Sequence, residues 1–147
     1  MTHNRQRLGE EGEARAARYL ESRGYQIVAR NVRAARVEID LIAKRRDCLV
    51  IVEVKTRRAT GPEGFGGHGR AAEAVDARKQ ARLRRGAVAW LRDQAGPGTR
   101  GRLRFDVVTC LFDARAGAGA DVHGPRNDDT ALPKDARWSF EHWEAAF

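Results

Sequence analysis

The sequence predicts an α/β protein in which a central mixed sheet of four or five strands is flanked by two helices. Residues 37–43 and 49–55 are short, rich in β-branched side chains and separated by a polar turn, which is typical of a β-hairpin. Residues 8–23 and 71–93 instead repeat small and apolar side chains at helical spacing. The resulting order is helix, strand, hairpin, helix, strand, within one domain spanning residues 1–147.

The first helix is predicted from Leu8 to Arg23, with Gly24 ending it. Its inward face carries mostly small side chains, at positions Gly9, Glu13, Ala16, Ala17 and Leu20. A glutamate on such a face is costly unless it is paired or binds a metal. The alternative is that Glu13 lies at the margin of the stripe and bonds an arginine, and the sequence leaves both open.

A strand over residues 25–32 leads into the hairpin, whose strands carry four charged side chains. If Asp40 lies opposite Glu53, then Glu38 lies opposite Lys55, and a slide by two residues sets Glu38 opposite Glu53. Either register gathers three carboxylates and one ammonium on one face, whereas a slip by one residue would separate them. Opposed carboxylates need a compensating cation, so the hairpin predicts a functional site more strongly than a surface salt-bridge cluster.

The remainder of the chain supplies one helix and two strands. A glycine-rich segment over residues 59–70 is either a flap beside the site or a simple connector. In the following helix, Lys79 interrupts an apolar stripe within a basic run. Residues 102–112 form a strand with Asp106 inside its apolar run, and Trp138 with Phe140 alternate as a last strand. Residues 113–136 are predicted to be a disordered insertion, because they have little to bury.

The charge of the chain is uneven. The net charge is +8, but residues from 113 onward carry −3, which leaves +11 on residues 1–112. This excess favours a polyanionic partner, with nucleic acid ahead of a membrane surface. Arginine outnumbers lysine 24 to 4, so Lys55 and Lys79 mark places where a guanidinium would not replace an ammonium.

Other composition features exclude several classes of protein. No apolar run reaches the roughly 20 residues of a membrane span, and the first residues do not resemble a signal peptide. Cys48 and Cys110 form no disulfide framework, so a reducing cytoplasm is the expected compartment. The four histidines lack the spacing of a zinc site.

The combination of Asp40 with Glu53-Val54-Lys55 on the next strand resembles the PD-(D/E)xK nuclease superfamily and its restriction-endonuclease-like fold. The chain is similar, more specifically, to the YraN family of small bacterial proteins, which resemble archaeal Holliday-junction resolvases. The matching segments are residues 9–20, 30–31, 38–43, 52–57, Lys79, 104–108 and 142–147. Two departures are Ile39, where the superfamily has proline, and residues 113–136, which match nothing.

The resemblance implies a Mg²⁺- or Mn²⁺-dependent endonuclease that hydrolyses phosphodiester bonds in DNA, including branched or recombination intermediates. Asp40, Glu53 and the Val54 carbonyl would be metal ligands, since magnesium takes one or two carboxylates and keeps several waters. Lys55 would orient the attacking water or stabilise charge on the phosphate. Glu13 would assist catalysis, and Glu38 would stay outside the first ligand sphere.

Four basic side chains are expected to hold the nucleic-acid backbone without reading bases, namely Arg57, Arg58, Lys79 and Arg82. The rival interpretation is a nucleic-acid-binding module of the same fold without turnover, and a third is an interaction protein with a structural acidic patch. The sequence leaves open the choice between DNA and RNA, the shape of the substrate and the formation of a homodimer.

Overall fold

The computed structural model describes residues 2–59, 75–94, 101–116 and 137–147. These residues form two helices and five strands: α1 (Thr2–Ser22), β1 (Gln26–Ala34), β2 (Val37–Arg45), β3 (Cys48–Arg58), α2 (Ala77–Gln94), β4 (Arg102–Phe112) and β5 (Trp138–Trp143). The strands make one sheet in the order β1-β2-β3-β4-β5. Only β3 and β4 are parallel within it, with α2 between them in the chain. The predicted α/β architecture with a mixed, helix-flanked sheet is confirmed, and it is compatible with a restriction-endonuclease-like fold.

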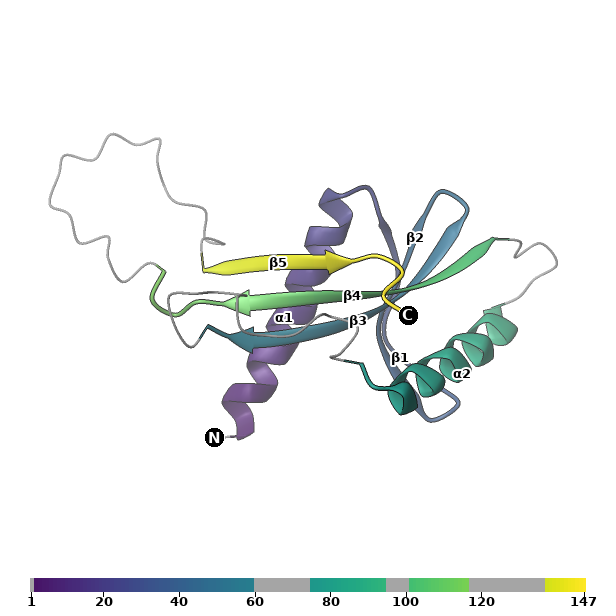
Figure 1. Ribbon diagram of the computed structural model, residues 1–147, viewed down its shortest axis with the longest axis horizontal. Helices are drawn as coiled ribbons and strands as arrows, with labels where there is room; N and C mark the ends of the chain where they lie inside the picture. Colours follow the sequence, from purple (N-terminus) through teal and green to yellow (C-terminus); the bar gives the residue numbers. More distant parts are fainter. Residues whose placement is uncertain (1, 60–74, 95–100, 117–136) are drawn as a thin grey trace, which may run out of the picture.

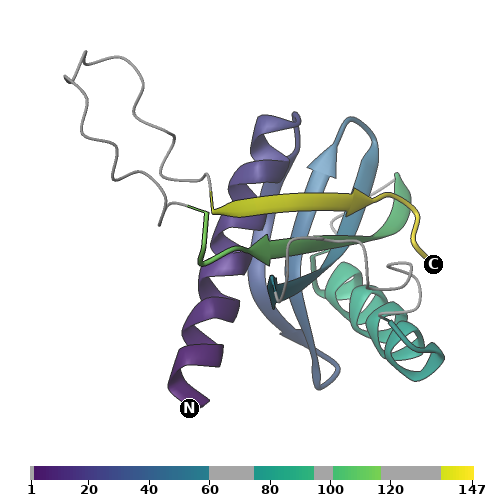
Figure 2. The same cartoon turned by 60° about the vertical axis from the view of Figure 1, so that its left-hand side comes forward.

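The two helices cover opposite faces of the sheet (Figures 1 and 2). Side chains of β3 alternate between the two cores, with Val50 and Val52 packed in the core under α1 and Ile51 in the core under α2. From α1 that core receives Ala16, Ala17 and Leu20, as the predicted stripe requires. Leu83 and Ala87 of α2 are likewise buried. Both helices are therefore held by the apolar faces that their sequences indicate.

The helix ends follow from local chemistry. Gly24 has a φ of 85°, and the N–H groups of Gly24 and Tyr25 bond the carbonyls of Glu21 and Leu20, which is the Schellman pattern of a helix end. The helix α1 begins earlier than predicted, at Thr2. The start of α2 was predicted too early. The chain at Val75 and Asp76 is not helical, and Asp76 caps the helix by accepting the N–H of Lys79 at 2.8 Å.

Strand β2 departs from regular alternation at Asp40. Its ladder with β3 runs from Arg45↔Cys48 to Leu41↔Val52 and stops there. Ile39 and Leu41, which are two residues apart, are both buried but belong to different cores. β1 and β2 thus turn away from the layer of β3, β4 and β5 (Figure 1). The assumption of a strict two-residue period along β2 was wrong, because the strand twists sharply where it leaves its neighbour.

Two predictions fall mainly outside the described residues. The glycine-rich segment 59–70 is described only at Ala59, and the insertion 113–136 only at residues 113–116. Cys48 and Cys110 are both buried and free, as expected. Neither described helix combines the length and the apolar character that crossing a membrane would require.

Candidate active site at the fork of two strands

The site forms where β2 separates from β3. Continuing the observed ladder by one residue sets Asp40 level with Glu53, which is the first of the two predicted registers. The backbone pairing has ended at that level, and the Asp40 side chain replaces it. Its Oδ2 accepts the backbone N–H of Val54 at 2.8 Å. The fork therefore points a carboxylate into the space that a regular hairpin would fill with backbone hydrogen bonds.

Glu53 lies at the centre of the site with only 4% of its side chain exposed. One of its oxygens, Oε1, receives two ammonium groups. Lys55 Nζ lies at 3.2 Å and Lys79 Nζ at 2.6 Å. Both lysines are partly exposed, so they extend from the surface to the buried carboxylate. Lys79 was predicted to contact nucleic acid, and its ammonium lies on Glu53.

Helix α1 brings Glu13 to the same fork because it packs very closely on the sheet. A Cβ on Gly12 would overlap the side chain of Thr56, so only glycine allows this approach without a shift. The carbonyl of Gly12 also accepts a hydrogen bond from the Cys110 thiol at 3.5 Å. Glu13, the next residue, is half-buried, and the Asn31 side chain lines the same pocket and lowers the pKa of Glu13. The structure thus places Glu13 at the margin of its stripe, but with an amide partner rather than an arginine.

The Asp40 carboxyl has an unusually high pKa of about 7. Burial is the main cause, and the neighbouring carboxylates of Glu53 and Glu13 raise the pKa further. The N–H of Val54 and the charge of Lys79 oppose this shift. A carboxyl whose pKa is raised by burial and by neighbouring carboxylates is typical of a functional site rather than of a structural ion pair.

Glu13 is perturbed in the same direction. Burial raises its pKa most, followed by the charges of Glu10, Glu53 and Glu38, while the hydrogen bond from Asn31 lowers it. Glu13, Asp40 and Glu53 therefore interact as one acidic cluster. Glu38 joins it only through its charge, since it is exposed and pairs across the β1–β2 ladder with Arg33.

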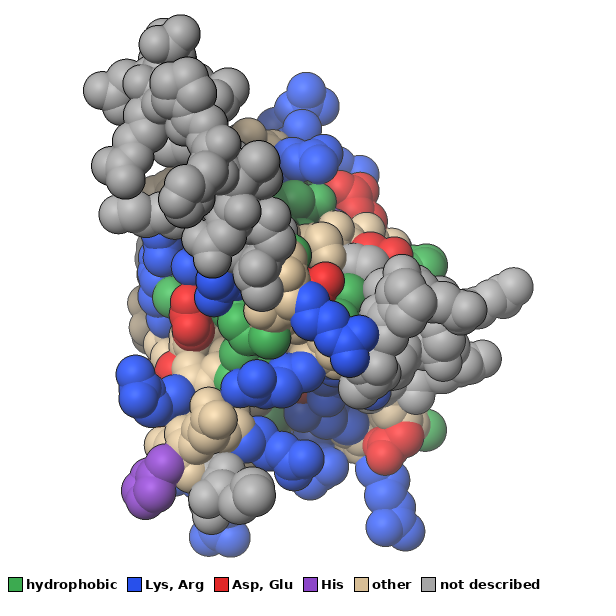
Figure 3. Space-filling model, turned by 90° about the vertical axis from the view of Figure 1, so that its left-hand side faces the viewer, with side chains coloured by type: hydrophobic (Ala, Val, Ile, Leu, Met, Phe, Trp, Pro, Cys, Tyr) green, Lys and Arg blue, Asp and Glu red, His purple; other side chains and the backbone are tan. Residues whose placement is uncertain are grey.

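Three of the four predicted nucleic-acid contacts are exposed at the end of β3 or on α2. Arg57, Arg58 and Arg82 are exposed, and Arg58 donates to Asn4 at 3.3 Å while lying over the ring of Phe112. Figure 3 shows one face of the molecule on which basic side chains are spread across the described surface, with fewer acidic ones between them. This distribution agrees with the positive excess of residues 1–112.

The donor set suits a hard divalent cation. Among the described residues, no three acidic, histidine or cysteine side chains stand together as a ready-made metal cage. Magnesium does not need one, since it takes one or two carboxylates and keeps several waters. Asp40 and Glu53 supply those carboxylates, and a cation between them would relieve the repulsion that raises the Asp40 pKa. Val54, whose carbonyl was predicted as a further ligand, presents its N–H to Asp40.

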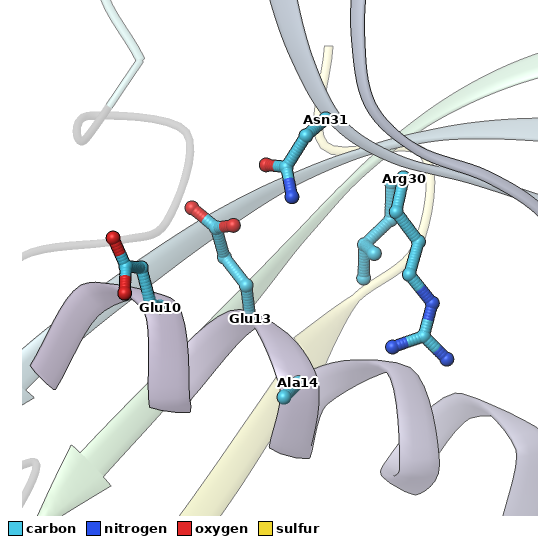
Figure 4. Close-up of a pocket in the computed structure, with 6 residues that line it drawn as sticks. Glu10, Glu13, Ala14, Arg30 and Asn31 are labelled. Carbon is cyan, nitrogen blue, oxygen red and sulfur yellow. The ribbon is translucent and has the colours of Figure 1, made fainter. Parts of the chain in front are cut away.

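A pocket beside Glu13 contains residues that the sequence did not single out as functional (Figure 4). Its lining residues are Glu10, Glu13, Ala14, Arg30, Asn31 and Leu41. Glu13 and Asn31 point toward each other across it, from α1 and β1 respectively (Figure 4). The available signal was an asparagine within an otherwise β-prone segment, where it marks an irregular backbone.

Comparison with known proteins identifies close relatives of the chain. The model of the family described as "Uncharacterised protein family UPF0102" matches residues 12–110. A UPF0102 protein of Rhodococcus jostii is 46% identical over 126 residues, covering 86% of this chain and 92% of its own. One of Corynebacterium efficiens is 45% identical over 132 residues, covering 89% and 99%. A third, of Roseiflexus castenholzii, is 42% identical over 125 residues, covering 85% and 95%.

Proposed function

The chain belongs to the uncharacterised protein family UPF0102, and we propose that it is a divalent-metal-dependent endonuclease acting on phosphodiester bonds in DNA. One observation carries the proposal. At the fork of β2 and β3, the charges of Glu13, Asp40 and Glu53 act on one another, and two lysine ammoniums lie on Glu53. The resemblance to the YraN family and to the PD-(D/E)xK nucleases supports the same chemistry.

Asp40 and Glu53 would hold Mg²⁺ or Mn²⁺, with the Val54 carbonyl as a third ligand. When bound, the metal supplies Lewis-acid polarisation of the phosphate and a more acidic water. Asp40 is suited to this task because the N–H of Val54 fixes one of its oxygens at 2.8 Å. Glu53 is suited because its burial strengthens its interaction with any nearby cation.

Lys55 and Lys79 would act on the phosphate and on the attacking water. In the structure both ammoniums lie on Oε1 of Glu53, at 3.2 and 2.6 Å. A lysine on a flexible stem can move from that oxygen to a phosphoryl oxygen and stabilise the charge that develops there. Lys55 is the stronger candidate for orienting the water, because it lies on β3 two residues after Glu53 and therefore on the same face.

The substrate we favour is DNA bound through its backbone, in branched or otherwise structured form. Arg57, Arg58 and Arg82 are exposed and would contact phosphates without reading bases. We also propose a cytoplasmic location, because both cysteines are free thiols. Homodimer formation, as in the resolvases, belongs to the same proposal.

One observation favours a second candidate, a nucleic-acid-binding module without turnover. Glu53 already receives two protein ammoniums at Oε1, so its negative charge is balanced without a metal. If this arrangement persisted in solution, the site would bind a phosphate through its lysines and cleave nothing.

Incubation with branched, flapped and linear DNA, with and without Mg²⁺ or Mn²⁺, decides between these functions. Metal-dependent cleavage that Glu53→Gln removes is the expected result. Glu11→Gln, an exposed glutamate on α1, is the matched control and should cleave normally. Binding without cleavage under every metal would favour the module, and the absence of both would exclude both functions.

A further inference from the structure

Asn31 occupies an irregular position in β1, level with the acidic cluster. The β1–β2 ladder pairs Arg30 with Leu41 and Val32 with Ile39, and it skips Asn31 and Asp40 between them. Asn31 has a φ of 48°, in the left-handed region that asparagine tolerates better than most residues. The same level of β3 carries Glu53. At this one level of the sheet, β1 and β2 depart from regular pairing and β3 carries Glu53.

The Asn31 side chain uses this irregularity to reach helix α1. Its amide faces the Glu13 carboxylate across the pocket that both residues line (Figure 4), and it lowers the pKa of Glu13. The charges named as raising the pKa of Glu13 belong to carboxylates, those of Glu10, Glu53 and Glu38, although Arg30 lines the same pocket. A neutral amide can orient a carboxylate without balancing its charge, whereas an arginine or lysine would consume the charge that a cation needs.

We propose that Asn31 is a positioning residue of the nuclease centre, whose amide holds the Glu13 carboxylate on the side of Asp40 and Glu53. This inference rests on the proposed function. The backbone conformation and the side chain act together. Asn31 has a positive φ at a position that the ladder skips, its amide faces Glu13 (Figure 4), and this contact would fix the direction in which Glu13 offers its oxygens.

Asn31→Gly separates this role from a structural one. Glycine adopts a positive φ without strain, so the variant removes the amide and keeps the backbone. We expect the urea midpoint of unfolding to stay at its wild-type value. The affinity for Mn²⁺, measured by titration calorimetry, should fall about 10-fold, and kcat should fall by a similar factor with KM for DNA unchanged. Ala35→Gly, with a wild-type φ of 49° in the same hairpin, is the matched control and should change neither quantity.

A double variant tests whether Asn31 acts through Glu13. Glu13→Gln and the double variant Asn31→Gly/Glu13→Gln should bind Mn²⁺ equally well, since the amide has no carboxylate left to hold. Additive losses would overturn the inference, as would wild-type affinity and kcat in Asn31→Gly. Wild-type protein that neither binds Mn²⁺ nor cleaves DNA would instead overturn the proposed function. In that case the contact is tested by the side-chain amide resonances of Asn31, which Glu13→Gln should shift and Glu11→Gln should not.

Discussion

Two carboxylates of the same sheet, Asp106 in β4 and Asp40 in β2, meet opposite surroundings. Asp106 is fully buried, and its two oxygens are surrounded by hydrogen-bond donors. Arg104 bonds both oxygens at 2.8 Å, His142 lies at 2.7 Å and the N–H of Ala145 at 3.0 Å. Burial alone would raise the pKa of Asp106, but His142, Arg104 and Ala145 together hold it below its ordinary value.

Asp40 keeps part of its surface exposed, and burial together with neighbouring carboxylates raises its pKa to about 7. It receives one backbone hydrogen bond from Val54, and its nearest charged partners include the carboxylates of Glu53 and Glu13. Asp106 therefore ties the C-terminal segment to the sheet, whereas Asp40 is still repelled by the neighbouring carboxylates. Unbalanced charge of this kind lowers stability and persists where function needs it.

Among the variants, Asp40→Asn should show the largest difference between its effect on cleavage and its effect on stability. Cleavage should fall at least about 1000-fold, equivalent to ~4 kcal/mol of transition-state stabilisation, because a metal ligand is lost. The free energy of unfolding should stay constant or rise, since the change removes repulsion from Glu53 and Glu13. DNA affinity should be kept or improved. Single-turnover cleavage and urea unfolding measure these effects, and a clear loss of stability would show that Asp40 is structural.

Asp106→Asn should give the reverse result. It leaves the Arg104 guanidinium with only its longer ion pair to Glu144, at 3.4 Å, so the free energy of unfolding should fall by about 3 kcal/mol. Cleavage per folded molecule should stay unchanged. Asp47→Asn, at an exposed ion pair with Arg102, is the control and should cost less than about 0.5 kcal/mol. A loss of cleavage without a loss of stability would contradict the division between the two regions.

The sequence predicted the parts of the site that are local in the chain. The hairpin and the position of Lys55 follow from two β-branched runs and a short polar turn, whereas the register was left between two alternatives, of which the structure has the one that sets Asp40 level with Glu53. Gly24 likewise marked the end of α1. These features depend on a few neighbouring residues, so pattern and propensity were sufficient.

The contacts that cross between elements could not be predicted. Lys79 meets Glu53 only because α2 returns over the sheet, and the sequence indicated only a basic helix. Asn31 reaches Glu13 through a positive φ, which no periodic pattern reports. Asp106 was visible inside an apolar run, but its partner His142 lies on β5 and becomes its neighbour through strand pairing.

The pH dependence of stability should run in opposite directions for the two carboxylates. Asp40 has a raised folded pKa, so in metal-free protein its contribution is favourable at low pH and is lost as the pH rises from about 4 to about 7. The difference between wild type and Asp40→Asn should amount to about 3 kcal/mol across this window. Asp106 has a lowered folded pKa, so it stabilises above its unfolded value and loses this effect only in stronger acid. Urea unfolding in the presence of a chelator measures both effects. If the free energy of unfolding of wild type minus that of Asp40→Asn rose with pH, the direction assigned to the Asp40 pKa would be wrong.

Lys55→Arg offers the finest test, because it changes the acidic cluster without changing its charge. The ammonium of Lys55 lies 3.2 Å from Glu53 with 27% of its side chain exposed, and a guanidinium is larger, planar and unable to yield its proton. Cleavage should fall about 30-fold, or ~2 kcal/mol, while DNA binding stays unchanged. Lys44→Arg, at an exposed position of the same hairpin, is the matched control and should cleave normally. If Lys55→Arg cleaved as fast as wild type, the positive charge alone would be sufficient at this position. The special role of the ammonium would then be wrong, while Asp40 and Glu53 could still form the metal centre.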